Sequence, residues 1–172
     1  AFASSCENED IDPTQGHEDA KGAVDKAATA FSSWWQTPLD ERADALERFA
    51  DLLEANRIEL MSIAVYEAKK TIPDALGEVR EAVDFCRYYA QQARDGLAPI
   101  ALPGPTGERN ILRYEGRGVW ACIAPWNFPL AIFLGQIAAA LVAGNTVVAK
   151  PAPQTPQIAA RAVALAHQAG IP

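Results

Sequence analysis

The sequence predicts an α/β fold in which a helical first half is followed by a strand, a helix, a second strand and a final helix. Three observations predict this order. Apolar residues recur every three or four positions up to about residue 94, and Gly and Pro then break the pattern across 95–108. Two short apolar segments follow, and each is succeeded by a stretch with helical spacing.

No regular element is predicted for residues 1–16. They are polar and acidic, contain Pro13 and Gly16, and show neither a helical nor a strand period, so we expect an extended or disordered segment. From His17 onward, alanines at helical spacing predict a first helix, with Trp34 and Trp35 anchoring its end.

Three more helices are expected before residue 95. Thr37 as N-cap and Pro38 in the first turn begin the second helix, whose apolar face contains Leu39, Ala43, Leu46, Ala50 and Leu53. The third begins at Asn56. The fourth covers roughly Asp74 to Arg94 and is predicted to bury Leu76, Val79, Val83 and Phe85.

Strands and helices alternate in the second half. After the Gly- and Pro-rich loop come two β-like segments, "NILRYE" and "GVWACIA", and the second is apolar enough to be covered on both faces. A helix ending at Gly144, a strand "NTVVAK" and a helix opened by Thr155 and Pro156 complete the pattern. Because crossovers of such β-α-β units are right-handed, the two strands should be parallel.

Composition excludes several classes of protein. The formal net charge of -7 and the lack of a basic stripe argue against nucleic acid as a partner of this segment. The most apolar stretch, 130–143, is shorter than the roughly 20 residues needed to cross a bilayer, so no transmembrane segment is expected. Cys6, Cys86 and Cys122 show no metal or disulfide spacing, which predicts no metal site and a cytoplasmic location.

Asn127 is the first candidate for chemistry. It lies between the end of a predicted parallel strand and the next helix, where open α/β sheets bind ligands, and Pro125 and Pro129 restrict the backbone around it. Its amide could donate to a developing oxyanion. The alternative is that Asn127 caps the following helix, a position that Asn favours.

Three other groups have two interpretations each. Lys150 ends the second strand, where it could bind ribose hydroxyls or a phosphate, or simply be solvated; no GxGxxG motif is present. Cys122 has no nearby base and is better explained as a buried thiol than as a nucleophile. The carboxylates Glu78, Glu81 and Asp84 suggest a solvated helix face, although one of them could face a substrate pocket.

The motifs "IAPWNFP" and "GNTVVAKPAPQTP", together with "EVREAVDFCRYYA", resemble the aldehyde dehydrogenase superfamily. Within it, the chain is similar to glutamate-γ-semialdehyde (pyrroline-5-carboxylate) dehydrogenases of the proline utilization A type, from about residue 18 to residue 172. The resemblance implies a Rossmann-like NAD-binding domain, of which residues 17–172 would be an incomplete part. The helical front would be 17–95, the loop and flap strand 96–117, and the first two parallel strands with their helices 118–172.

For the site, the resemblance implies that Asn127 is the side-chain half of an oxyanion hole. Lys150 would bind the adenosine ribose, while Phe128 and Glu81 would face the substrate. The nicotinamide side of the cofactor site would be lined by Ile123, Ala124, Pro125 and Trp126. The implied reaction is NAD(P)-dependent oxidation of L-glutamate γ-semialdehyde to glutamate in proline catabolism, by a homo-oligomer. FAD would be involved only if a proline dehydrogenase module lies outside this chain.

The sequence departs from the family pattern at two positions. Pro153 occupies the place of a Glu that accepts from ribose hydroxyls, which leaves NAD and NADP both open, and Lys69 replaces a Gly. The family's catalytic Cys and general-base Glu match no residue here, so we expect an inactive N-terminal fragment of a longer enzyme. The alternatives are a noncatalytic binding or oligomerisation module, and a piece of another enzyme such as succinate semialdehyde dehydrogenase.

Overall fold

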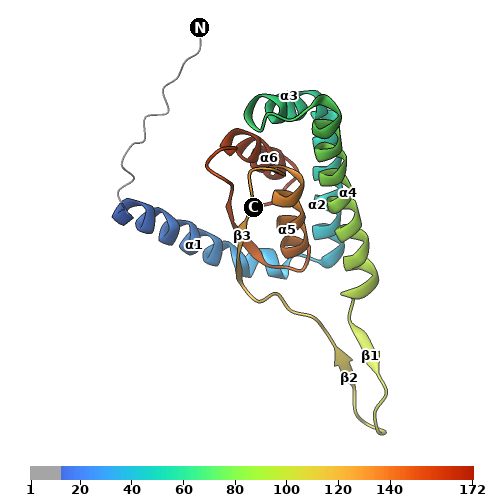
Figure 1. Cartoon of the computed structure of the whole chain (residues 1–172). Helices are drawn as coiled ribbons and strands as arrows, with labels where there is room; N and C mark the ends of the chain where they lie inside the picture. The colour runs from blue at the N-terminus through green and yellow to red at the C-terminus, as the bar shows by residue number, and fades with distance from the viewer. Residues whose placement is uncertain (1–12) are drawn as a thin grey trace.

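A computed structural model describes residues 13–172, with side chains from residue 18 onward. Four helices come first: α1 (Pro13–Gln36), α2 (Leu39–Ala55), α3 (Arg57–Glu67) and α4 (Ile72–Gly96) (Figure 1). The strands β1 (Ile100–Leu102), β2 (Asn110–Leu112) and β3 (Val119–Ile123) follow. The chain continues through α5 (Ala131–Val142), β4 (Thr146–Lys150) and α6 (Pro156–Gln168).

The predicted helices and the strand, helix, strand, helix order are therefore confirmed. One boundary was wrong, because Pro13 to Gly16 already belong to α1. Pro is favoured in the first turn of a helix, where its missing N–H has no partner to lose. The remainder of the predicted N-terminal segment, including Cys6, lies outside the described residues, as does the side chain of His17.

Helices α2 and α4 form the centre of the helical front and run antiparallel. Arg87 of α4 pairs with Asp51 and Glu54 of α2. Arg94, which comes later in α4, pairs with Asp44 and Glu47, which come earlier in α2. These ion pairs lie at the rim. Beneath them the apolar faces are buried, with Leu46, Phe49, Leu53, Val79, Ala82, Val83 and Cys86 in the core.

The strands β3 and β4 pair in parallel, as predicted, with Val119 opposite Thr146 and Ile123 opposite Lys150. Helices α1 and α5 both pack against this pair. Trp34 anchors the end of α1 as predicted, since its buried indole N–H donates to the carbonyl oxygen of Leu141 at 2.9 Å. The expectation that β3 is covered on both faces was wrong, because Trp120 is 50% exposed.

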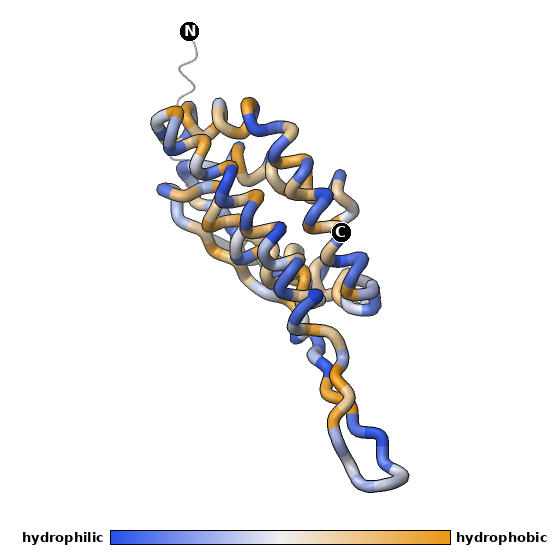
Figure 2. The backbone as a smooth tube through the Cα atoms, turned by 90° about the vertical axis from the view of Figure 1, so that its right-hand side faces the viewer, coloured by the Kyte–Doolittle hydropathy of each residue, from blue (hydrophilic) through white to orange (hydrophobic). Residues whose placement is uncertain are grey.

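A two-stranded antiparallel hairpin, β1–β2, projects from the body of the molecule below the end of α4 (Figure 1). The sequence predicted β2 but assigned β1 to a loop, since its three residues are too few to show a period. Apolar residues occupy both strands and polar residues the tip (Figure 2). Ile100, Leu102, Ile111 and Leu112 are all exposed.

Two side-chain predictions for the helical front were also wrong. Thr37 does not cap α2: its hydroxyl donates to the Ser33 carbonyl oxygen of the preceding helix, and Pro38 occupies the N-cap position. Leu76 is 38% exposed, because the buried side of α4 is set by Ala75, Val79 and Ala82. Both outcomes depend on how neighbouring helices meet.

Helix α5 ends where the sequence predicted. Gly144 follows the C-cap residue Ala143 with φ +86°, a left-handed conformation that glycine adopts without steric cost. No helix within residues 13–172 combines the length and apolar character needed to span a membrane.

Candidate functional site

The carboxyl ends of β3 and β4 bring the predicted cofactor residues to one edge. Ile123 lies opposite Lys150, and the amide of Ala124 donates to the Lys150 carbonyl oxygen at 3.2 Å. Pro125 and Trp126 continue directly from this contact. Ile123 is 65% exposed and Trp126 54% exposed, and the Lys150 side chain is also exposed. An apolar surface with a cation beside it therefore remains open at this edge.

Asn127 lies in the bend between β3 and α5 and does not cap the helix. Helix α5 begins at Ala131 and its N-cap residue is Leu130, whose side chain makes no capping hydrogen bond. The Asn127 side chain is exposed and makes no hydrogen bond with any described residue. The cap interpretation is therefore wrong, and the amide is free to donate to a ligand.

Glu78 of α4 performs the capping that Asn127 does not. One carboxylate oxygen, Oε2, accepts from the amide of Leu130 at 3.1 Å and from that of Ala131 at 3.0 Å. The residue is 1% exposed. Its other oxygen, Oε1, lies 2.8 Å from Nζ of Lys70. A negative charge at a helix N-terminus is stabilised by the backbone dipoles, and the lysine compensates its burial.

Lys70 also contacts the bend itself. Its Nζ lies 4.0 Å from the centroid of the Phe128 ring, within the distance of a cation–π interaction. Phe128 is adjacent to Asn127 in the chain. One ammonium group therefore connects the buried Glu78 to the residue next to the candidate oxyanion donor.

Gln136 fixes the bend from the other side. Its side-chain amide donates to the carbonyl oxygen of Ile123 at 3.1 Å, which ties α5 to the end of β3. The bend thus runs between two anchored ends: Ile123 is held through Gln136, and Leu130 is held through Glu78.

The predicted substrate residues lie on two elements. Phe128 is in the bend and partly exposed, while Glu81 is exposed on α4, three residues beyond Glu78. The sequence considered Glu78 as one of three acids on a solvated face, and it is instead buried. A signal was available, since Glu78 falls in register with the buried positions Ala75 and Ala82.

Neither described cysteine has the properties of a nucleophile. Burial raises the pKa of the Cys86 thiol to about 12 and raises the pKa of Cys122 as well. A thiol with a raised pKa is protonated at neutral pH and reacts slowly. The interpretation of Cys122 as a buried structural thiol is therefore supported by its surroundings.

Comparison with known proteins shows the family of the chain. Residues 12–172 match the family model described as "Aldehyde dehydrogenase family". The chain belongs to the aldehyde dehydrogenase family. It is 50% identical over 150 residues to the bifunctional protein PutA of Klebsiella aerogenes, covering 87% of this chain and 10% of that protein. It is 41% identical over 157 residues to the 1-pyrroline-5-carboxylate dehydrogenase of Bacillus pumilus, covering 91% of this chain and 30% of that protein.

A solved aldehyde dehydrogenase structure shares the fold. The 1-pyrroline-5-carboxylate dehydrogenase from Thermus, a structure with bound NAD, superposes with a TM-score of 0.87 at 37% identity, over 91% of this chain and 30% of that one. The chain thus spans between a tenth and a third of the length of the relatives it matches.

Proposed function

We propose that this chain forms part of an NAD-dependent aldehyde dehydrogenase that oxidises L-glutamate γ-semialdehyde, derived from pyrroline-5-carboxylate, to glutamate. The observation that carries the proposal is the free amide of Asn127, held at the carboxyl edge of a parallel strand pair by a bend with both ends anchored. The names of the relatives, PutA and 1-pyrroline-5-carboxylate dehydrogenase, supply the substrate class.

In this proposal Asn127 stabilises negative charge on the aldehyde oxygen. Attack on the carbonyl carbon moves charge to the oxygen, and an amide N–H fixed beforehand can stabilise that charge without reorganising. The exposed position of Asn127 leaves its two N–H groups available, and the anchored bend limits their movement.

The edge of β3 and β4 fits a nicotinamide cofactor. Ile123, Pro125 and Trp126 are exposed and offer apolar surface to a flat ring, whereas Ala124, the fourth residue expected to line this site, is 6% exposed and belongs to the core. The Lys150 ammonium offers a donor to ribose hydroxyls or a phosphate. When bound, the cofactor would accept the hydride of the substrate. The Pro153 side chain gives no acceptor for ribose hydroxyls, so NADP is a second candidate cofactor.

Phe128 and Glu81 are the proposed substrate contacts. The phenyl ring would pack against the aliphatic part of a semialdehyde, and Glu81 would accept a hydrogen bond from its polar end. The chain covers only part of the length of its relatives, so other residues also contribute to substrate choice. Succinate semialdehyde and related substrates should therefore be assayed alongside L-glutamate γ-semialdehyde. The regions 17–95, 96–117 and 118–172 are proposed as the helical front, flap and first strands of one NAD-binding domain.

The reaction needs a thiolate that the described residues do not supply, since Cys86 and Cys122 are both buried. We therefore propose that the nucleophile and general base lie outside residues 13–172, and that the 172 residues alone are inactive. NADH formation by pure 172-residue material would contradict this.

The full-length protein that contains this chain provides the main test. We expect NADH formation, followed by absorbance at ~340 nm, with L-glutamate γ-semialdehyde and a lower kcat/KM with succinate semialdehyde. Asn127→Ala should lower kcat by roughly 100-fold or more while leaving the affinity for NAD unchanged. Lack of NADH formation by the wild-type protein with any semialdehyde would overturn the proposal.

A second candidate function rests on the hairpin. Four apolar side chains of β1 and β2 are exposed on a two-stranded arm, an arrangement that is marginal unless something covers it. We propose that it contributes to a homo-oligomer. Replacing Leu102 and Ile111 with Ser should lower the mass measured by light scattering, and an unchanged mass would contradict this role.

A further inference from the structure

Glu78 is the one carboxylate buried among the described side chains, and its position needs an explanation. A buried carboxylate is unfavourable unless it is paired and hydrogen-bonded. Glu78 meets both conditions, because it accepts two amide hydrogens at the start of α5 and lies 2.8 Å from Lys70 Nζ.

The two amides belong to the end of the Asn127 bend. Leu130 lies three residues after Asn127, and the intervening Pro129 restricts the backbone between them. Helix α5 contains no acidic residue in its own first turn, so the charge at its N-terminus comes from α4. Loss of this charge would loosen the segment that carries Asn127.

Lys70 is held in place independently of the bend. It lies in the short connection between α3 and α4, after Lys69 with φ +56°, and its amide donates to the Ala64 carbonyl oxygen at 3.4 Å. Thr71 follows it and caps α4 by accepting from the amide of Asp74. The ammonium group therefore approaches Phe128 and Glu78 from a fixed backbone.

We infer that Lys70 and Glu78 are positioning residues that orient the Asn127 amide for reaction, Glu78 through the start of α5 and Lys70 through Glu78 and the Phe128 ring. This inference rests on the proposed function. Neither residue is placed in contact with the reacting atoms. Their effect is on the geometry of the oxyanion donor, so it should lie in kcat and not in the binding of the cofactor at Lys150.

The test uses the full-length protein that contains this chain. Lys70→Met removes the cation but keeps a side chain of similar length. We expect kcat to fall by about 10-fold or more, because small displacements of a catalytic group are costly, while the Kd for NAD changes less than about two-fold. Lys70→Arg, which retains the positive charge, should recover part of the loss.

A double variant separates positioning from simple loss of a contact. In Lys70→Met the Glu78 carboxylate stays buried without its cation, whereas Lys70→Met/Glu78→Gln removes both charges and retains an acceptor for the two amides. The double variant should therefore have a higher kcat than Lys70→Met. Hydrogen exchange should accelerate at the amides of Leu130 and Ala131 in Lys70→Met and slow again in the double variant.

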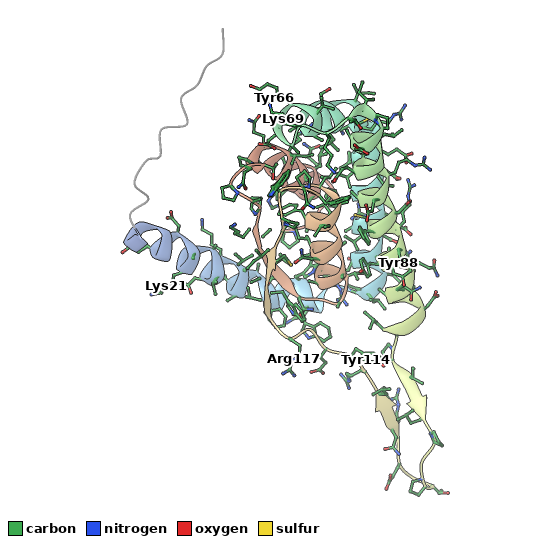
Figure 3. The ribbon with its side chains drawn as sticks, in the orientation of Figure 1. Lys21, Tyr66, Lys69, Tyr88, Tyr114 and Arg117 are labelled. Atoms are coloured by element: carbon green, nitrogen blue, oxygen red, sulfur yellow. The ribbon has the colours of Figure 1, made fainter. Side chains whose placement is uncertain are left out.

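Lys69→Met is the matched control. Lys69 is adjacent and also cationic, but its Nζ lies over the Tyr66 ring and donates to the Tyr66 carbonyl oxygen, and the two side chains lie close together beside α3 (Figure 3). Its kcat should equal that of the wild type. An active wild type with unchanged kcat and unchanged exchange in Lys70→Met overturns this inference alone. A wild type inactive toward every semialdehyde overturns the proposed function, while the exchange measurement still reports on the bend. If Lys70→Met does not fold, equal kcat in the double variant and the wild type overturns the inference.

Discussion

Arg42 donates its Nε–H to the carbonyl oxygen of Val142 at 3.0 Å, at the carboxyl end of α5. Arg48, further along α2, donates in the same way to Ala169 at the carboxyl end of α6. The amino ends of these two helices are capped by Glu78 and by Glu67, which accepts from the amides of Gln157 and Ile158. The helical front thus places cations and anions where the backbone dipoles of α5 and α6 favour them.

Arg42→Met should destabilise the chain strongly. Arg42 is buried and also donates to the carbonyl oxygens of Trp35 and Thr37, and burial lowers the pKa of its guanidinium from the ordinary value. Its removal leaves buried carbonyl groups without donors, so we expect a loss of about 2–4 kcal/mol in urea unfolding. Arg48→Met is the control, because Arg48 is exposed and its capping contribution should be below ~1 kcal/mol. Equal losses would contradict the importance of burial.

Lys69→Gly should stabilise the chain. The family pattern that the sequence resembles has Gly at this position, and Lys69 adopts a left-handed conformation that favours glycine, with φ +56°. Glycine relieves steric strain of about 1–2 kcal/mol. It also increases the conformational entropy of the unfolded chain, which offsets part of this gain, so we expect a net stabilisation of roughly 0.5–1 kcal/mol. Lys69→Ala keeps the Cβ and should not stabilise. A gain in the Ala variant would show that the lysine side chain is the cause.

Gly144→Ala should destabilise for two reasons. The residue has φ +86°, and a Cβ added there would lie 2.5 Å from Cε3 of Trp35. We expect a loss above about 2 kcal/mol in thermal or urea unfolding. The control is Gly77→Ala in α4, where no heavy atom lies within 4 Å and alanine should add about 0.5–1 kcal/mol. Similar effects of the two substitutions would contradict the close packing against Trp35.

The local pattern of the sequence was sufficient to predict the helices and the parallel strand pair. The spacing of Leu46, Ala50 and Leu53 follows one helix face, and the breaks at Gly144 and Gly170 end helices in the structure. Strand β1 and the Thr37 hydroxyl were not predictable in this way. A three-residue strand depends on its partner, and the Thr37 bond depends on the path between two helices.

The candidate site was predictable in part. The β-α-β pattern predicted parallel strands, so Asn127 and Lys150, each at a strand end, were expected at the same carboxyl edge, and the pairing of Ile123 with Lys150 brings them there. The sequence pattern could not distinguish an oxyanion donor from a helix cap, because Asn suits both roles at that position. The choice depends on Glu78, which is 52 residues from Leu130 in sequence.

Cys86 should make stability depend on alkaline pH. Its folded pKa is about 12 against an ordinary value of 9.0, so its contribution is fully present below pH ~9 and is lost as the pH rises toward 12. Between pH ~9.5 and ~10.5 the wild type should lose about 1 kcal/mol more than Cys86→Val in urea unfolding. Both proteins would carry Cys6→Ser, so that this thiol does not titrate in either protein. Parallel curves for the two proteins would contradict the raised pKa.

Asn127→Ala should leave stability unchanged while Glu78→Gln lowers it. The Asn127 amide has no partner among the described residues, so its removal should change the free energy of unfolding by less than ~0.5 kcal/mol, whereas a capping Asn would cost about 1 kcal/mol. Glu78→Gln removes the charge opposite Lys70 and should cost about 3 kcal/mol. Urea unfolding of both variants checks the expectation. A loss of about 1 kcal/mol or more in Asn127→Ala would restore the capping interpretation. If Asn127→Ala instead lowers kcat without changing the free energy of unfolding, then Asn127 acts on the reaction and Glu78 holds the segment that carries it.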